Sequence, residues 1–305
     1  MAIKLYTKQL ISVMPDIFAK KSAFLRSFGG ALQITDGVKN TDTFFELKAS
    51  DTDVVIQPYD LGADVAFGKG TGNSSRFGER KEVKSIDVQV PYEAPLATNE
   101  GVDNMTVNDD IDAVVAERLA LNTVAWAQYV DGLLSQAISK AASKTLTGDF
   151  TSDSIAKVFA EAHKEFVNNN VSETIGHVAY VTADVYDAII NSPLTTTGKA
   201  STANIDNQTI VKFKGFEVVE LPDTKFQKDE QIYFVADGVG VAGVGVQISR
   251  AMDSEDFAGI AIQSAGKYGK YIPEVNQKAV VKAKLTASAQ EAKADTAKAD
   301  ASKAK

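Results

Sequence analysis

The 305-residue sequence contains no cysteine, only two histidines and one tryptophan. Without cysteine there are no disulfides, no thiolate nucleophiles and no cysteine-based zinc sites, so packing and contacts between subunits must hold the fold. Acidic residues outnumber basic ones by 40 to 32, and the formal net charge is −8. Because tight binding to nucleic acid needs a surplus of cations facing the phosphates, this charge argues against that function.

Long hydrophobic runs are missing as well. No stretch approaches the roughly 18 apolar residues that a membrane span requires, and the N-terminus, Met1 to Tyr6, has no apolar signal region. We therefore expect a soluble chain that is made in a cytoplasm and has no membrane partner.

Residues 41–95 have the pattern of a long β-hairpin. In the return arm Ile86, Val88 and Val90 alternate with Asp87 and Gln89, and this period of two indicates a strand with one apolar face. The other arm carries the apolar residues Phe44, Phe45, Leu47 and Val54 to Ile56. The stretch between the arms is dense in glycine: Gly62, Gly68, Gly70, Gly72 and Gly78. A two-stranded ribbon of this length is marginal alone in water, so it must lie either on a neighbouring subunit or on the body of its own chain.

Residues 106–142 give the strongest helix prediction. Thr106 or Asn108 can cap its start, and the acids at 109, 110 and 112 lie where the helix dipole favours negative charge. Its apolar residues fall largely on one side: Ile111, Val115, Leu119, Trp126, Val130, Leu133 and Ile138. At about 1.5 Å per residue the helix would be roughly 55 Å long, either as a structural spine or as a long core helix.

The remaining segments predict a mixed α+β chain. An apolar segment at residues 1–40 contains a short helix, which either lies on another surface or is the first helix of the core. Helices are expected at 154–168 and 184–191, and a polar loop at 192–207. Strands are expected at 178–181, 210–221 (bent or paired around Gly215), 231–236, 246–249, 257–262 and 279–285. Residues 286–305, rich in Ala, Lys and Asp, have the composition of a mobile tail.

Sequence motifs for chemistry are weak. Gly238, Gly240 and Gly243 match the spacing of a dinucleotide-binding turn, but the residues that follow alternate like a strand, whereas such a turn must open a helix. Asn108, Asp110 and Asp112 have the spacing of the first calcium ligands of an EF-hand, but its required glycine and glutamate are absent. His163 and His177 lack a metal-binding spacing. We therefore expect no catalytic residue, cofactor or metal.

The order of these parts resembles that of a tailed-bacteriophage major capsid protein of the HK97-like fold. The stretch from Asp256 to Ile272 also looks like the end of such proteins from phages of Gram-positive bacteria. The resemblance spans roughly residues 1–285. It implies an N-terminal arm (1–40), an extended hairpin or E-loop (41–105), the spine helix of a peripheral domain (106–149), an axial domain (150–245), return strands of the peripheral domain (246–285) and a low-complexity flexible tail (286–305).

The resemblance also implies a function. The chain would be a virion protein that assembles in the host cytoplasm, as hexamers and pentamers, into an icosahedral shell around double-stranded DNA, which it does not bind specifically. A scaffolding protein and a portal would be its partners. An encapsulin-like nanocompartment shell has the same fold, and a nucleotide-binding enzyme using Gly238–Gly243 is the alternative from another class.

The residues for which the resemblance implies assembly contacts lie in the arm, the hairpin and the spine helix. They are Phe18, Phe28, Lys69, Gly70, Gly72, Arg76, Glu79, Arg80 and Trp126. Some relatives join a hairpin lysine to an asparagine of the next subunit, and Lys69 and Asn276 lie in the corresponding regions.

Overall fold

The structure is a computed structural model that describes residues 22–34, 43–50, 54–62, 76–83, 85–106, 111–192 and 212–286. The chain divides into two compact units, one of residues 40–91 and one that combines residues 1–39 with residues 92–305. Helices and strands are mixed, as the sequence predicts.

The unit of residues 40–91 contains the predicted hairpin. β2 (Thr43–Ser50) pairs antiparallel with β3 (Ser85–Pro91), with Leu47 opposite Val88. The register shifts between Thr43 and Phe45, and the side chains of Phe44 and Val90 are buried. The apolar run Val54–Ile56 lies beyond the end of β2 and has no regular secondary structure.

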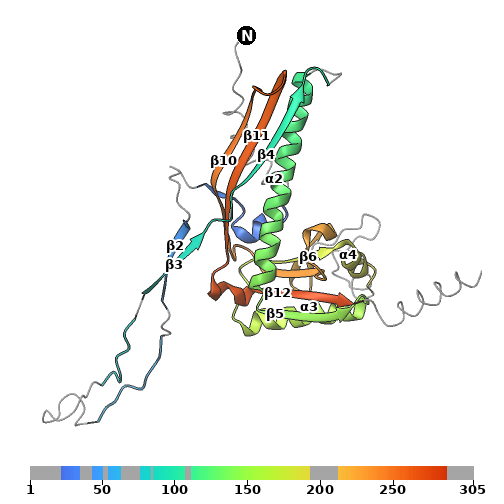
Figure 1. Cartoon of the computed structure of the whole chain (residues 1–305). Coiled ribbons are helices and arrows are strands. Elements are labelled where there is room, and N and C mark those ends of the chain that lie inside the picture. Colours follow the sequence, from blue (N-terminus) through green and yellow to red (C-terminus); the bar gives the residue numbers. More distant parts are fainter. Residues whose placement is uncertain are drawn as a thin grey trace, which may run out of the picture. The chain divides into compact units, whose positions relative to one another are not determined.

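A four-stranded sheet forms one part of the larger unit. Its order is β1 (Gln33–Ile34), β10 (Val241–Asp253), β11 (Gly259–Tyr271) and β4 (Leu96–Asp103). β10 and β11 form a long antiparallel pair, and β1 runs parallel to β10. The helix α2 (Ile111–Ala141) lies along these strands and continues to a second sheet (Figure 1).

Two predicted boundaries in this region are wrong. Residues 96–103 were predicted to belong to the hairpin, but β4 pairs with β11 along its whole length. The strands predicted at 246–249 and 257–262 are each 13 residues long in the structure. Alternation along one strand shows which face is apolar but does not identify the partner strand.

The second sheet has six strands in the order β5 (Lys144–Asp149), β12 (Val280–Thr286), β9 (Ile232–Ala236), β6 (His177–Thr182), β8 (Phe216–Leu221) and β7 (Lys212–Phe213). α3 (Ser152–Asn168) contacts β5 of this sheet, and α4 (Ala183–Ile190) contacts β6 and β8. This confirms the predicted helices and the strand pair around Gly215. β12 pairs with β5 and β9, so its predicted place among the return strands of the first sheet is wrong.

α2 contributes to two hydrophobic clusters. Near its start Val115 and Leu119 pack with Val102 and Ile262 of the four-stranded sheet. Further along, Trp126, Val130, Leu134 and Ile138 join the main core, which the six-stranded sheet also lines. The described helix has 31 residues, about 46 Å at the usual rise, and the predicted start at 106–110 lies mostly outside the described residues.

The end of the predicted N-terminal arm belongs to the core of its own chain. The 3-10 helix η1 (Leu25–Phe28) buries Leu25 and Phe28, and the preceding Phe24 has no exposed surface. Phe24 packs edge-on against Tyr180 of β6, with their ring centroids 4.9 Å apart. Of the two interpretations that the sequence left open, the structure therefore supports a core helix for this segment.

Candidate functional site

The glycine motif does not form a phosphate-binding turn. β10 begins at Val241 and continues as a strand, so no helix opens after Gly240. A Cβ atom at Gly240 would come within 2.7 Å of the Phe28 ring, which explains the glycine by packing. Within the described residues no group of three or more side chains could hold a metal ion, and no helix is long and apolar enough to cross a membrane.

The two histidines both lie beside Phe216. The ring centroid of His163, on α3, is 6.4 Å from that of Phe216, and the ring centroid of His177, on β6, is 5.9 Å from it. Each histidine has one buried ring nitrogen without a hydrogen-bond partner. Burial lowers the pKa of His177, so this imidazole is held in its neutral form.

Two of the residues expected at assembly contacts lie in the core. Phe28 is 2% exposed and Trp126 is 4% exposed, so neither offers a surface to another subunit. The indole Nε1 of Trp126 donates a hydrogen bond to Ser264 Oγ at 2.7 Å, which joins α2 to β11. The expectation of an assembly role is corrected for both residues because their side chains stabilise the fold of their own chain.

Of the other seven residues expected at assembly contacts, three lie in the described part of the hairpin and four lie outside the described residues. Phe18, Lys69, Gly70 and Gly72 fall outside the described residues. Arg76, Glu79 and Arg80 lie on the second arm. The remaining partner of the suggested crosslink, Asn276, donates its amide to Val239 O at 2.8 Å within its own chain.

The two arms of the hairpin stay in contact beyond the strands. The side chain of Gln57 donates to the carbonyl of Glu79 at 2.9 Å and accepts from the amide of Glu79 at 3.2 Å. The amide of Asp60 donates to the carbonyl of Arg76 at 3.0 Å. The rings of Tyr59 and Phe77 meet edge to face, with centroids 5.2 Å apart. The role of Gln57 could not be predicted from the sequence, because a single amide in an irregular segment gives no periodic signal.

Apolar side chains of these arm segments are exposed to solvent. They are Val54 (94% exposed), Val55 (48%), Ile56 (95%), Tyr59 (51%), Leu61 (78%), Phe77 (78%) and Val83 (70%). Clustered apolar exposure of this kind marks interaction surfaces in soluble proteins. We call residues 54–62 and 76–83 the distal arm, and they form the candidate functional surface.

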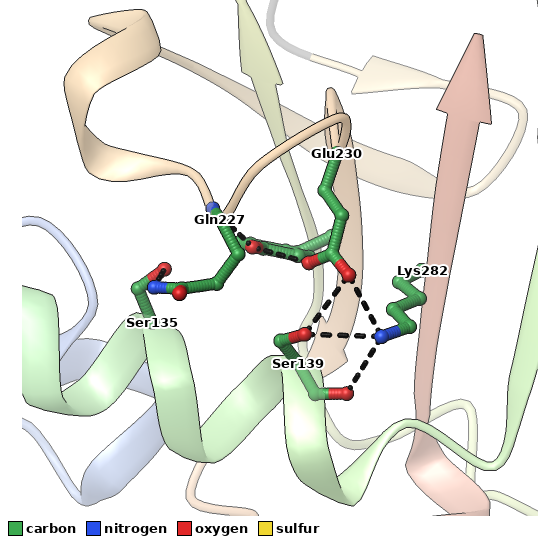
Figure 2. A network of polar contacts seen from close by, with 6 residues as sticks. Ser135, Ser139, Gln227, Glu230 and Lys282 are labelled. Carbon is green, nitrogen blue, oxygen red and sulfur yellow. Dashed lines mark hydrogen bonds and ion pairs between the residues drawn. The ribbon is translucent and has the colours of Figure 1, made fainter.

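A buried polar network joins α2 to the six-stranded sheet (Figure 2). Lys282 Nζ of β12 donates to Glu230 Oε1 at 2.7 Å and to the carbonyl and hydroxyl of Ser139, both at 3.0 Å. Tyr233 donates its hydroxyl to the other Glu230 oxygen at 2.7 Å. Burial by itself would raise the pKa of Glu230, but the hydrogen bonds from Lys282, Tyr233 and Ser139 outweigh it and lower that pKa.

A second buried ion pair holds the base of the N-terminal segment. Asp131 of α2 has no exposed surface and accepts Lys225 Nζ at 2.6 Å. It also accepts the Ser22 hydroxyl at 2.6 Å and the Ala23 amide at 3.0 Å. The sequence did carry a signal for both networks, since Asp131, Ser135 and Ser139 recur at four-residue spacing next to the apolar stripe of the helix.

No protein-family model matches the sequence, and no curated protein matches it. Solved structures do match. A chain from Mycobacterium phage Che8 is 17% identical with a TM-score of 0.62, over 94% of each chain. A chain from the capsid structure of the cyanophage P-SCSP1u is 9% identical with a TM-score of 0.65, over 88% of this chain and 89% of that chain. A chain from the asymmetric unit of the mature capsid of bacteriophage PhiM1 is 13% identical with a TM-score of 0.63, over 87% of each chain.

These likenesses cover nearly the whole chain, so it has the fold of the phage capsid chains. The level of identity establishes the fold alone.

Proposed function

We propose that this chain is a phage major capsid protein of the HK97-like fold that self-assembles into the icosahedral shell around the genome. The observation that carries the proposal is the likeness to chains of phage capsids over about nine-tenths of its length. The exposed apolar distal arm adds independent support, because such a surface needs a partner. The suggested Gram-positive host stays a prediction.

The parts of the fold take the following roles in this proposal. The four-stranded sheet with the first half of α2 is the peripheral domain. The six-stranded sheet with α3 and α4 is the axial domain, whose loops meet at the five-fold and six-fold axes. The hairpin is the E-loop.

The distal arm lies on a neighbouring copy in the proposed shell. Its most exposed apolar side chains are Ile56 and Val54, followed by Leu61 and Phe77. Covering apolar surface stabilises by about 25 cal/mol per Å², and the shell repeats this contact many times. A stable contact of this kind should bury at least about 1,000 Å² in total.

The other partners follow from the assembly. A scaffolding protein would set the curvature of the shell, and a portal would occupy one vertex. The net charge of −8 suits a shell that encloses double-stranded DNA without binding it specifically. The virion is then the location of the chain, after assembly in the host cytoplasm.

Size-exclusion chromatography with light scattering, followed by electron microscopy of the heaviest fraction, tests the proposal. Closed shells, or rings of five and six copies, are the expected result, and particle size and DNA content then separate a phage capsid from an encapsulin-like compartment. The double variant Ile56→Asp/Phe77→Asp should stay unassembled but folded. The matched control is Val275→Asp, at a 76%-exposed valine outside the hairpin, which should still assemble. A chain that remains a monomer even with its scaffold would contradict the proposal.

A further inference from the structure

Two residues of the larger unit, one before and one after the hairpin in the sequence, lie at neighbouring positions of β10. Before the hairpin, Ile34 of β1 pairs with Val244. After the hairpin, the ring of Tyr92 covers the next residue, Gly245. The hairpin unit ends at Pro91, so Tyr92 is the first residue of the larger unit after the hairpin.

Gly245 is a β-bulge. Val244 lies opposite Tyr268 and Val246 lies opposite Lys267, so Gly245 is the extra residue of β10. A Cβ atom there would come within 2.7 Å of the Tyr92 ring, so a larger residue at this position would have to displace the ring. Bulges interrupt regular strand pairing and change the direction of the strand. At this bulge the Tyr92 ring packs against the backbone of Gly245.

Further contacts fix the residues that follow the hairpin. Lys267 Nζ lies 5.4 Å from the centroid of the Tyr92 ring, within the range of a cation–π contact. The amide of Glu93 donates to Tyr268 O at 2.8 Å, and its carboxylate lies 3.2 Å from Lys270 Nζ. Lys270 in turn donates to Gln136 of α2 at 2.7 Å, which extends the chain of contacts to the helix.

We propose that the Gly245 bulge is the pivot of the hairpin and that Tyr92 is a positioning residue, which limits how far the hairpin swings before assembly. The role of the pivot in assembly rests on the proposed function, whereas the contacts that form the pivot do not. A hairpin confined in this way loses less freedom when it docks on a neighbour, because part of the ordering cost has already been met in the free subunit.

The test measures the swing in the unassembled full-length chain. Because the sequence has no cysteine, Val54→Cys (94% exposed) and Leu121→Cys (47% exposed) can carry one spin label each on the arm and on α2. Pulsed electron–electron double resonance then gives the distribution of distances between the labels. The Tyr92→Phe control should keep the narrow distribution of the parent chain, whereas Tyr92→Ala and Gly245→Ala should broaden it.

Melting temperatures show whether each variant is folded. Lys267→Gln, which removes the cation above the ring, replaces any variant that is not folded. Equal widths in all variants, or a parent distribution that is already broad, would overturn the pivot. Broadened variants that form shells as fast and as fully as the parent would overturn the positioning role. Failure of the parent chain to form shells would instead count against the proposed function, and the distance distributions would still decide the pivot.

Discussion

At the scale of single residues, Trp126 marks the point where α2 passes from one sheet to the other. Its ring is buried, and its indole binds Ser264 of β11. Trp126→Ala should lower the free energy of unfolding by about 3–5 kcal/mol, because it leaves a cavity in the core. Urea unfolding of the unassembled chain measures this.

The conservative variant Trp126→Phe separates packing from hydrogen bonding. It keeps most of the ring volume and loses the bond to Ser264, so the expected cost is about 1–3 kcal/mol. A Trp126→Ala variant as stable as the parent chain would show that the side chain is not part of the core.

The contact between Glu230 and Lys282 predicts that the stability losses from substituting these two residues do not add. Lys282→Met leaves a buried carboxylate without its cation and should cost about 3–5 kcal/mol. Glu230→Gln in the same chain should restore much of that loss, since no unpaired charge then remains. Additive losses in this double-mutant cycle would contradict the interaction seen in Figure 2.

His177 predicts a loss of stability on acidification. In the folded chain burial lowers the pKa of His177 below 6.5, its ordinary value in the unfolded chain. At a pH between these two pKa values, the unfolded chain binds a proton at this residue more readily than the folded chain does. Stability from this residue is therefore complete above pH 6.5 and declines as the pH falls through the window below it. His177→Gln should flatten that decline in melting temperature; an unchanged pH profile would show that His177 is not its source.

At the scale of elements, the distal arm is held together by few contacts. Gln57→Ala removes both bonds to Glu79, so the amide of Glu79 should exchange its hydrogen faster. Gln89→Ala is the matched control, because Gln89 donates to the side chain of Glu46 on the surface of the same hairpin and not to Glu79. Equal exchange at Glu79 in both variants would show that Gln57 does not join the arms.

Local patterns predicted the local elements well. The sequence predicted a helix at residues 154–168, which is α3, and its apolar face is buried in the structure: Ile155, Val158, Phe159, Ala162 and Phe166. Alternation near Ile86 to Val90 gave β3. Partnerships between distant segments were not predictable in this way, because nothing in 279–285 indicates that β12 lies between β5 and β9.

The same limit applies to the candidate sites. The hairpin was predicted as a contact surface, but its exposed apolar side chains could be identified only once the strands were seen to end at Ser50 and to begin again at Ser85. Phe28 and Trp126 were expected at assembly contacts, and burial in their own core corrects this. A sequence shows that a side chain is apolar, but not whether its own chain or another one covers it.

At the scale of the whole molecule, one chain carries two kinds of surface. The larger unit buries most of its large apolar side chains in its own core, whereas those of the distal arm are exposed. That division is what a repeating shell requires, because each copy must fold before it joins its neighbours. In the proposed function, which the likeness to phage capsid chains supports, the exposed apolar side chains of the distal arm contact a neighbouring copy.

A cryo-electron microscopy reconstruction of particles formed by the full chain with its scaffold tests this account most directly. The account predicts a closed shell in which the distal arm of each copy, with Ile56 and Phe77, rests on a neighbouring copy and loses its exposure to solvent. Closed shells in which the arm stays exposed, or folds back on its own subunit, would contradict it.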